Sequence, residues 1–325
     1  MDKQIKKVSI VMCTYNGERY LRQQLDTLLT QTYPLHEIIV QDDGSSDNTW
    51  RILSEYAASH PFIHIFHNEG EHGYNGNFFS AMQRATGDYI AICDQDDLWK
   101  PEKIEKQVTA IGSNLLCVCL TKPFSDDTQV VFDYDQRIPN YHLVRLLYAS
   151  IPGHTMLFSR KIFPLLPPID NTYYHTAYDV ILASVAASYG SIAMVSEVLV
   201  DHRRLTSSVS YAKADKHRKR TKSNALYIVS WGLRHYFSRR YLVRERFNNR
   251  LALFLQIHAD TTDYHDAVNI LRYEASKGLL AFLKLEALMV KHRRHLFYAY
   301  ENGGVGILAH ALLLPIMMVY YYGQK

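Results

Sequence analysis

The sequence has few cysteines, and their spacing fits neither a metal finger nor a disulfide framework. Its 325 residues include 4 cysteines, Cys13, Cys93, Cys117 and Cys119, each inside an expected strand. A chain of this length can bury a sizeable core without covalent cross-links. We therefore expect the cysteines to be small buried core residues of a protein in a reducing cytosol.

Long hydrophobic runs are also scarce. The first residues, Met-Asp-Lys-Gln-Ile-Lys-Lys, lead directly into a short strand and lack the apolar region of a signal peptide. The stretch 304–322 is apolar except for His310, contains Pro315, and is just long enough to span a thinned bilayer. A buried or interfacial helix is the favoured interpretation, because the histidine, the proline and the single span weaken the transmembrane alternative. Whether this stretch spans, lies on or avoids the membrane stays open.

Neither sign of charge dominates, since the net charge is only +4. Basic residues are concentrated in two blocks, 213–222 and 291–295. Such blocks suit an anionic lipid surface, although a solvated helix face is at least as common. Nucleic acid is a disfavoured partner, because no recognition motif accompanies the blocks. Together with the apolar stretch that follows it, the second block predicts a cytoplasmic protein, peripheral at the inner face of the plasma membrane.

Short apolar runs alternate with amphipathic segments in the N-terminal part of the chain. Short β-branched runs predict strands, and apolar residues at helical spacing predict helices between them. The predicted strands are 7–13, 38–40, 62–66, 89–93, 115–120, 155–158, 192–195 and 198–200, with 130–134 as a hairpin partner. This alternation predicts an α/β fold with a mostly parallel sheet and helices on both faces. Strand signals then stop, so we expect an α/β domain over 1–212 and a helical region over 213–325.

Polar side chains follow three of these strands where each strand ends. They are Thr14, Tyr15 and Asn16 after the first strand, Asp42 and Asp43 after the second, and Asp94, Asp96 and Asp97 after the fourth. Ligands of open parallel sheets bind at the carboxyl ends of the strands. Three carboxylates crowded at the end of a buried strand repel one another unless a cation lies among them. Mg²⁺ or Mn²⁺, which also binds diphosphate oxygens, is the simplest candidate.

Four segments in the expected order resemble glycosyltransferase family 2, whose members have the GT-A, Rossmann-like nucleotide-sugar-binding fold. They are Val8-Ser9-Ile10-Val11-Met12-Cys13-Thr14-Tyr15-Asn16, Gln41-Asp42-Asp43-Gly44-Ser45-Ser46-Asp47, Ala85-Thr86-Gly87-Asp88-Tyr89-Ile90 and Asp94-Gln95-Asp96-Asp97-Leu98-Trp99-Lys100-Pro101. Four motifs in order are far more specific than any one of them. The resemblance covers roughly residues 6–210 and is strongest to bacterial transferases that build lipopolysaccharide, capsule or exopolysaccharide, rhamnosyl- and glucosyltransferases among them.

This resemblance implies inverting, metal-dependent transfer of a sugar from a dTDP-, UDP- or GDP-linked donor. The acceptor would be a hydroxyl of a glycan or of a polyprenyl-diphosphate-linked glycan in cell-surface polysaccharide biosynthesis. For donor binding, Thr14 and Tyr15 would flank and stack on the base with Asn16 beside them, Asp42 would hydrogen-bond the base, and Asn77 would help hold the donor. The alternative for Asp42 is a turn capped by its own side chain, and Asp43 is left open.

The resemblance also implies a metal site and a catalytic base. Asp96 is the first choice for direct metal contact, and Asp94 would contact the sugar or ribose, or reach the metal through water. Asp97 is expected to cap the helix that begins near Pro101. Asp179, at the start of an apolar helix, matches the base that deprotonates the acceptor hydroxyl. From the residues alone, a helix-cap acid stabilised by the helix dipole is the alternative.

The run 201–206 departs from the family pattern. Relatives carry a histidine near the diphosphate where this chain has Leu205, so Arg203, Arg204 or His202 would supply the positive charge, with Arg203 placed first. Two other classes of protein stay open. One is another nucleotide-sugar enzyme such as a nucleotidyltransferase, although the basic loop that such enzymes carry after the first strand is missing. The other is a non-catalytic scaffold with a GT-A-like fold.

Overall fold

The computed structural model describes residues 5–130, 134–168, 176–206, 225–297 and 305–323. The basic block 213–222, the boundary expected at 212 and the middle of the hairpin expected at 130–134 lie outside these residues. The chain divides into two compact units, one made of Met1–Asp135, Ser150–Ala186 and Ser191–Thr206, the other of Gln136–Ala149, Ala187–Gly190 and Ser207–Lys325. Two short segments that the sequence assigned to the α/β domain, 136–149 and 187–190, thus belong to the helical unit.

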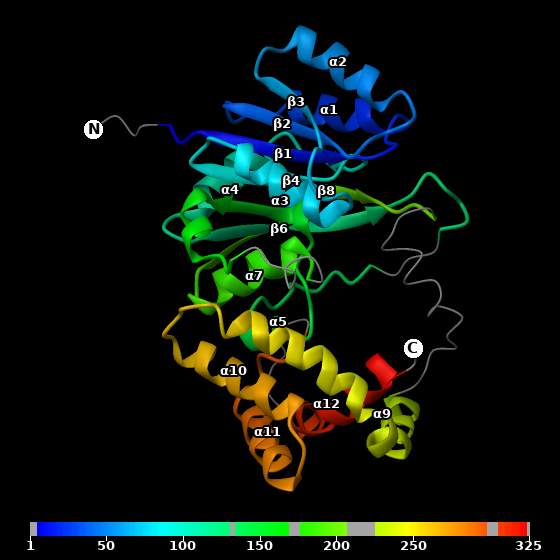
Figure 1. Cartoon of the computed structure of the whole chain (residues 1–325), viewed down its shortest axis with the longest axis vertical. Helices are drawn as coiled ribbons and strands as arrows, with labels where there is room; N and C mark the ends of the chain where they lie inside the picture. Colours follow the sequence, from blue (N-terminus) through cyan, green and yellow to red (C-terminus); the bar gives the residue numbers. More distant parts are fainter. Residues whose placement is uncertain (1–4, 131–133, 169–175, 207–224, 298–304, 324–325) are drawn as a thin grey trace. The chain divides into compact units, whose positions relative to one another are not determined.

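The first unit is built on one mixed sheet of eight strands, in the order β3-β2-β1-β4-β7-β6-β8-β5 (Figure 1). Strands β3, β2, β1 and β4 are mutually parallel, β7 is antiparallel to both β4 and β6, and β6 is parallel to β8. The bounds are β1 Val8–Thr14, β2 Glu37–Asp42, β3 Ile63–His67, β4 Tyr89–Cys93, β5 Leu98–Trp99, β6 Leu116–Phe124, β7 Met156–Ser159 and β8 Ile192–Arg203. The carboxyl ends of β1, β2 and β4 therefore meet at one edge.

Helices connect the parallel strands and bury their apolar faces on the sheet. The helices of this unit are α1 Leu21–Leu29, α2 Thr49–Ser59, α3 Tyr74–Arg84, α4 Lys103–Ile111 and α7 Tyr178–Ser188, the last belonging to it up to Ala186. In α1, Leu21, Leu25 and Leu28 are fully buried because they recur at the spacing of one helix face. The four cysteines are free and buried, which confirms their prediction as core residues.

Strand β8 differs from the sequence expectation. Two short strands were expected at 192–195 and 198–200, but the structure has one continuous strand, Ile192–Arg203. The register to β6 shifts where Val195 pairs with Cys119 and Val198 pairs with Leu120. Ser196 and Glu197, the two exposed polar residues between Val195 and Val198, form a bulge rather than a strand end. A bulge keeps the strand in the sheet while bending it.

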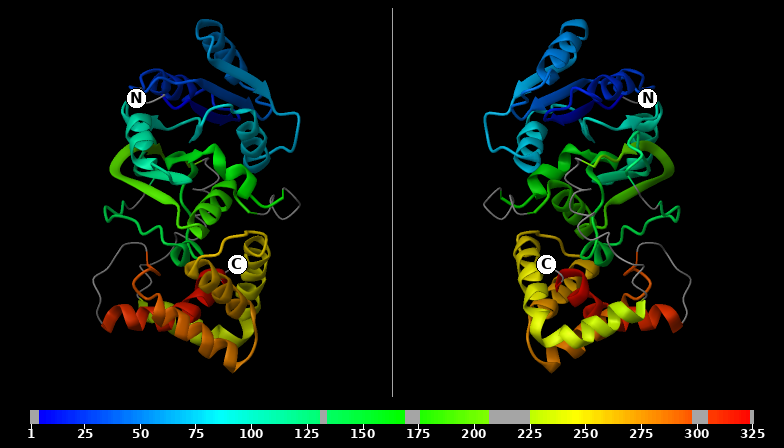
Figure 2. Two further views of the ribbon diagram at one scale, coloured as in Figure 1. Left: turned by 90° about the vertical axis from the view of Figure 1, so that its left-hand side faces the viewer. Right: turned by 90° about the vertical axis from the view of Figure 1, so that its right-hand side faces the viewer.

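The second unit is a group of packed helices. They are α5 Leu143–Leu146, α9 Ala225–Phe254, α10 Thr262–Ala275, α11 Leu279–Lys291 and α12 Val305–Gly323. Helix α9 packs against α10 and α12, and α11 against α10 and α12, as both views in Figure 2 show. The α9–α12 crossing is close at Gly232, where an added Cβ would lie 2.5 Å from the main-chain oxygen of Ile316. A glycine at this position is what permits that approach.

Helix α12 contains the apolar stretch found in the sequence. Within the described residues, Gly306–Gly323 is the one segment long and apolar enough to cross a membrane, and 44% of it is buried in the protein. Buried Arg240 of α9 donates to the main-chain oxygen of Pro315 at 3.2 Å and forms an ion pair with Glu274 of α10. One side of α12 is therefore fixed to neighbouring helices by packing and by a buried polar contact.

Candidate active site

The loops after β1 and β2 are joined by side-chain hydrogen bonds. Thr14 Oγ1 donates to Asp42 Oδ1 at 2.7 Å, and the same carboxylate accepts from the hydroxyl and main-chain N–H of Ser45 at 2.6 and 2.8 Å. Asn16, which has a positive φ of 47°, accepts from the main-chain N–H of Ser46 at 2.9 Å. Asp42 is buried, and its hydrogen bonds shape this turn. Contact of Asp42 and Thr14 with a base stays a prediction.

The loops after β1 and β4 are braced by Gln95. Its side-chain oxygen accepts from the main-chain N–H of Tyr15 at 2.9 Å, and its amide nitrogen donates to the Tyr15 oxygen at 3.1 Å. Gly17 leaves room for this brace, because a Cβ there would lie 2.4 Å from the Gln95 oxygen. Tyr15 is 58% exposed, and its stacking on a nucleotide base stays a prediction.

Asn77 lies on the inner side of α3. It is buried and exchanges hydrogen bonds with Gln41: its Oδ1 accepts from the Gln41 amide at 2.9 Å and its Nδ2 donates to the Gln41 main-chain oxygen at 3.2 Å. These bonds tie α3 to β2. The residue thus supports the strand that ends in Asp42, and its predicted contact with the donor is untested.

The acids after β4 lie against two histidines. Asp94, Asp97, His154 and His202 form a group whose carboxylate oxygens and ring nitrogens lie within 4.8 Å of one another. His154 Nδ1 is 3.2 Å from Asp94 Oδ2, and His202 Nδ1 is 2.9 Å from Asp97 Oδ1. The two imidazole rings stack with their centroids 4.4 Å apart.

Asp97 does not cap a helix, so that expectation was wrong. Helix α4 begins at Lys103 without a side-chain cap, whereas the 0% exposed Asp97 accepts from the main-chain N–H of Arg203 at 3.0 Å. The cause is the short strand β5, which follows Asp97 and pairs antiparallel with β8. Although burial acts to raise it, the pKa of Asp97 is lowered, because His154 and His202 stabilise the carboxylate.

The three aspartates after β4, Asp94, Asp96 and Asp97, form an acid cluster that fits a divalent cation. Among the residues that the structure describes, none donates a hydrogen bond to the buried Oδ2 of Asp97. Burial and the charges of Asp97 and Asp94 raise the pKa of Asp96 to about 7. Carboxylates that repel one another in this way are stabilised by a positive ion. The group within 4.8 Å contains Asp94 but not Asp96, the residue first expected to bind the metal.

Arg203 is buried beside the acid cluster. Its Nε donates to the main-chain oxygen of Asp96 at 2.9 Å and its Nη2 to Gln23 at 2.8 Å, and it forms an ion pair with Asp126. The guanidinium also lies over the rings of Tyr20 and Phe124. These contacts hold the loop after β4 in place, and the expected contact of Arg203 with a diphosphate is untested.

Asp179 lies in the first turn of α7, and two features hold that turn in place. Asn75 of α3 accepts from the main-chain N–H of Tyr178 at 2.8 Å and donates to the Thr176 oxygen at 2.9 Å. Tyr178 is buried against Gly153, where an added Cβ would lie only 2.1 Å from the tyrosine hydroxyl. The beginning of α7 is thereby tied both to α3 and to the turn before β7.

The environment of Asp179 suits a base at neutral pH. Its Oδ1 accepts from the main-chain N–H of Val180 at 2.7 Å. Burial, followed by the charge of Asp94, raises the pKa of Asp179 to about 6, against the opposing effects of the Val180 hydrogen bond and of His154. A carboxylate with a pKa near 6 is mostly ionised at pH 7 and still basic enough to accept a proton.

The fold and the solved structures that resemble it define a class. The chain superposes on Staphylococcus aureus TarS 1–349 in complex with UDP-GlcNAc with a TM-score of 0.55 and 15% identity, covering 97% of this chain and 90% of that one. For the mannosyltransferase PcManGT from Pyrobaculum calidifontis, in complex with GDP-Man and Mn²⁺, the TM-score is 0.51 with 16% identity, covering 99% and 89%. The first unit therefore has the GT-A fold, which confirms the fold expected from the sequence.

Sequence comparison narrows this class to a family. Residues 9–165 match the model of Glycosyl transferase family 2. An uncharacterized glycosyltransferase of Haemophilus influenzae is 28% identical over 240 residues, which are 69% of this chain and 74% of the relative. Putative glycosyltransferase EpsE and the putative teichuronic acid biosynthesis glycosyltransferase TuaG, both of Bacillus subtilis, are 41% and 37% identical, each over 31% of this chain and 37% and 40% of their own lengths. Residues 9–165 therefore form a domain of the Glycosyl transferase family 2 type.

Three residues of the site escaped the sequence reasoning. Gln95 lies between Asp94 and Asp96 and reads as a spacer, and Asn75 reads as one residue of a Gly/Asn-rich loop. His202 was weighed only as a source of positive charge, but it faces Asp97. Each of the three contacts a residue at least 80 positions away along the chain; Gln95 and Tyr15, for example, are 80 positions apart. Local sequence patterns therefore could not have identified them.

Proposed function

We propose that this glycosyltransferase is metal-dependent and inverting, and that it transfers a sugar from a nucleotide-diphosphate donor to a hydroxyl of a glycan or lipid-linked acceptor. The observation that carries the proposal is the Asp179 carboxylate, which is electrostatically coupled to Asp94 and has a pKa of about 6. One acid cluster for the diphosphate and one separate basic carboxylate are what a single in-line displacement needs. A single displacement inverts the anomeric centre.

The residues of the site have separable tasks in this reaction. Asp179 takes the proton from the acceptor hydroxyl as that oxygen attacks the anomeric carbon. Asp94 and Asp96 would hold Mg²⁺ or Mn²⁺, which would supply Lewis-acid stabilisation of the leaving diphosphate. Asp97 and His154 orient Asp94, since His154 lies 3.2 Å from Asp94 and 3.5 Å from Asp97. The exposed Tyr15 stacks on the base.

The choice of donor and of acceptor class rests on the relatives. TarS was solved with UDP-GlcNAc, and PcManGT with GDP-Man and Mn²⁺. The name of TuaG refers to teichuronic acid, a cell-surface polymer. These names support a UDP- or GDP-linked donor and a role in polysaccharide biosynthesis for this chain, and a dTDP-linked donor rests on the sequence resemblance alone.

Assays with a panel of sugar donors and metal ions test the proposal. Sugar transfer and donor hydrolysis are measured with UDP-, GDP- and dTDP-sugars, with EDTA and after addition of Mg²⁺ or Mn²⁺. We expect activity with one nucleotide class, loss in EDTA, and losses of about 10²–10³-fold in Asp94→Asn and Asp96→Asn. Asp88→Asn is the matched control, because Asp88 precedes the same strand β4 and accepts from the main-chain N–H of Lys7. Activity unaffected by metal, or donors that never alter the melting temperature, would contradict it and favour the scaffold alternative.

We also propose that the second unit binds the inner face of the plasma membrane from the cytoplasm without crossing it. Along α9, Leu226, Leu233, Phe237 and Tyr241 recur at helical spacing and are all more than half exposed, with Phe237 at 96%. Leu279, Leu280 and Leu283 are similarly exposed at the beginning of α11. Apolar side chains at this density favour an interface with lipid. One face of α12 is buried in the helical unit, which supports peripheral attachment to the membrane rather than a membrane-spanning helix.

Vesicle flotation tests this attachment. Burying one large apolar side chain in lipid contributes about 1.5–3 kcal/mol, so Phe237→Asp is expected to weaken vesicle binding at least about tenfold. Ile138→Asp is the matched control, because Ile138 is 50% exposed in the same unit and lies on neither helix. Equal flotation of the two variants would contradict the proposal, as would resistance of the wild-type protein to extraction at high pH, which marks a spanning protein.

A further inference from the structure

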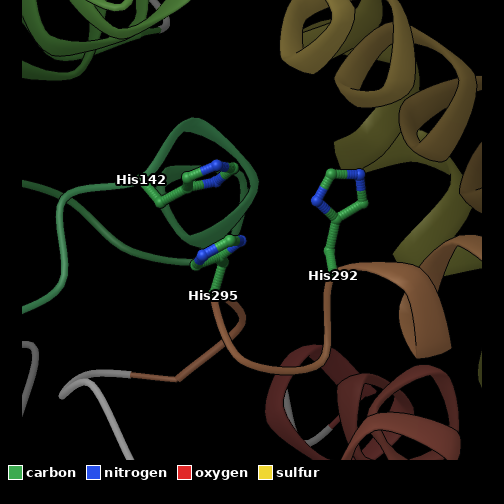
Figure 3. A group of neighbouring side chains, drawn as sticks. All are labelled: His142, His292 and His295. Carbon is green, nitrogen blue, oxygen red and sulfur yellow. The ribbon is translucent and has the colours of Figure 1, made fainter.

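Three histidines from two separate segments of the second unit lie together. They are His142, just before α5, and His292 and His295, just after α11, with ligand nitrogens within 4.8 Å of one another. Figure 3 shows the rings of His142 and His295 one above the other, with His292 beside them. The stacked rings have centroids 4.1 Å apart and are 11° from parallel. The reaction proposed above uses none of these side chains.

His292 is held as a metal ligand would be. Its Nε2 lies 2.7 Å from the Asp266 carboxylate, and both side chains are largely buried. The Asp266 carboxylate also accepts a hydrogen bond from Lys291 at 2.5 Å, which favours its ionised form. We therefore assign the His292 contact as a hydrogen bond donated by Nε2–H to that carboxylate. The other ring nitrogen, Nδ1, then carries a lone pair, and in Figure 3 a ring nitrogen of His292 points toward the other two histidines. A carboxylate behind the imidazole is the usual support of a metal-bound histidine.

A second carboxylate lies behind His142. Asp263 of α10 is 3.1 Å from His142 Nε2, while the main-chain N–H of Val144 lies 3.3 Å from Nδ1. The latter contact is longer than the usual 2.9–3.0 Å, so giving it up for a metal bond costs little. Asp263 and Asp266 together offset the charge of a dication.

The two histidine-bearing segments are tied together by one buried side chain. Asn140 donates to the main-chain oxygen of His295 at 2.9 Å and accepts from the main-chain N–H of His142 at 2.9 Å. The imidazoles are thus presented by main chain at a fixed separation. Burial, followed by the neighbouring histidines, lowers the pKa of both His142 and His295, and Asp263 acts in the opposite direction.

We propose that His142, His292 and His295 form a structural binding site for a divalent transition-metal ion, with Zn²⁺ the best match. Imidazole ligands favour Zn²⁺ over Mg²⁺ or Mn²⁺, which favour oxygen. Tetrahedral Zn–N bonds of about 2.0–2.1 Å place ligand nitrogens about 3.4 Å apart. The ligand nitrogens, which lie within 4.8 Å of one another, therefore approach by at most about 1.4 Å on binding, and water provides the fourth ligand. The ion would join the α5 segment to the end of α11.

Metal titration of the full-length protein tests the site. The Asp94→Asn variant, which lacks one carboxylate of the group formed with Asp97, His154 and His202, is stripped of metal and titrated with Zn²⁺ against a chromophoric chelator, and with Co²⁺ to detect tetrahedral absorption. We expect one Zn²⁺ per chain and a rise in melting temperature on binding. Adding His295→Ala should abolish both, and adding Asp266→Asn should weaken Zn²⁺ binding about 10–100-fold. His265→Ala is the matched control, because this exposed histidine pairs with Asp260 in the same unit.

Zinc binding at the three histidines can be told apart from binding at the acid cluster. Equal Zn²⁺ affinity with and without His295→Ala would overturn the proposal, as would a bound ion that only acid-cluster variants release. If His295→Ala fails to fold, Asp266→Asn decides the matter, since it leaves all three imidazoles in place. A protein that ignores Zn²⁺ but loses helix between pH 7 and pH 5.5 would show a proton-responsive cluster instead, which also overturns the metal site.

Discussion

Replacing Asp179 with asparagine should abolish activity and stabilise the protein at the same time. The substitution keeps the size of the side chain and keeps an oxygen to accept the Val180 N–H at 2.7 Å, so the first turn of α7 is preserved. What it removes is a buried carboxylate whose pKa is raised to about 6 from the ordinary aspartate value of 3.8. Activity and stability should therefore move in opposite directions.

The magnitude for activity comes from the lost base. General-base catalysis contributes typically 10²–10⁴-fold, so kcat of Asp179→Asn should fall by about that factor. In the wild-type protein, kcat/KM should rise about tenfold per pH unit at acidic pH and level off above about pH 6. A cation near Asp94 would move this midpoint down, because positive charge favours the ionised form of Asp179.

The magnitude for stability follows from proton linkage. The folded protein holds the Asp179 proton more tightly than the unfolded chain does, so stability falls as pH rises from about 4 to about 6. This difference in proton affinity corresponds to about 3 kcal/mol, and partial exposure of the side chain reduces it to about 1–2 kcal/mol. Asp179→Asn escapes this loss, so above pH 6 it should melt about 2–8 °C higher than wild type.

Paired measurements make the reasoning refutable. Initial rates and melting curves of both proteins are compared at pH 4.5 and pH 7.5, with donor held at saturation for the rates. The stability advantage of Asp179→Asn should be fully present at pH 7.5 and about one third as large at pH 4.5. A variant with activity within about threefold of wild type would remove Asp179 from the base role. A variant less stable than wild type at pH 7.5 would show that the carboxylate is a structural cap instead.

Three further predictions concern the supports of the site and the helical unit. Asn75→Ala should lower kcat by about tenfold with little change in the donor KM, because it releases the turn that carries Asp179 and not the donor loops. Gly153→Ala should cost about 1–3 kcal/mol in chemical denaturation, because the new Cβ has no room beside the buried hydroxyl of Tyr178. Arg240→Met should cost about 3–5 kcal/mol by leaving Glu274 buried and unpaired, and adding Glu274→Leu should restore most of the lost melting temperature.

The α/β fold was readable from the sequence because its signals are local. Buried β-branched runs predicted β1 to β4, and the apolar helix expected to start at Asp179 is observed as α7. Strand β8 was split in the prediction because Ser196 and Glu197 look like a strand end, whereas pairing with β6 carries the strand through a bulge. The second unit offered amphipathic helices without a pairing rule, so the segments 136–149 and 187–190 were not expected to join it.

The sequence by itself determined the family, the edge of the sheet where polar loops gather, and the acids available there, because motifs and strand ends are properties of neighbouring residues. Only the tertiary structure decided which side chains meet. It set Asp97 against His202, Asn75 against the beginning of α7, and His142 against His295, at separations of 105, 103 and 153 positions along the chain. Burial and charge act through space, so the pKa of a carboxylate such as Asp179 depends on neighbours that no stretch of sequence names.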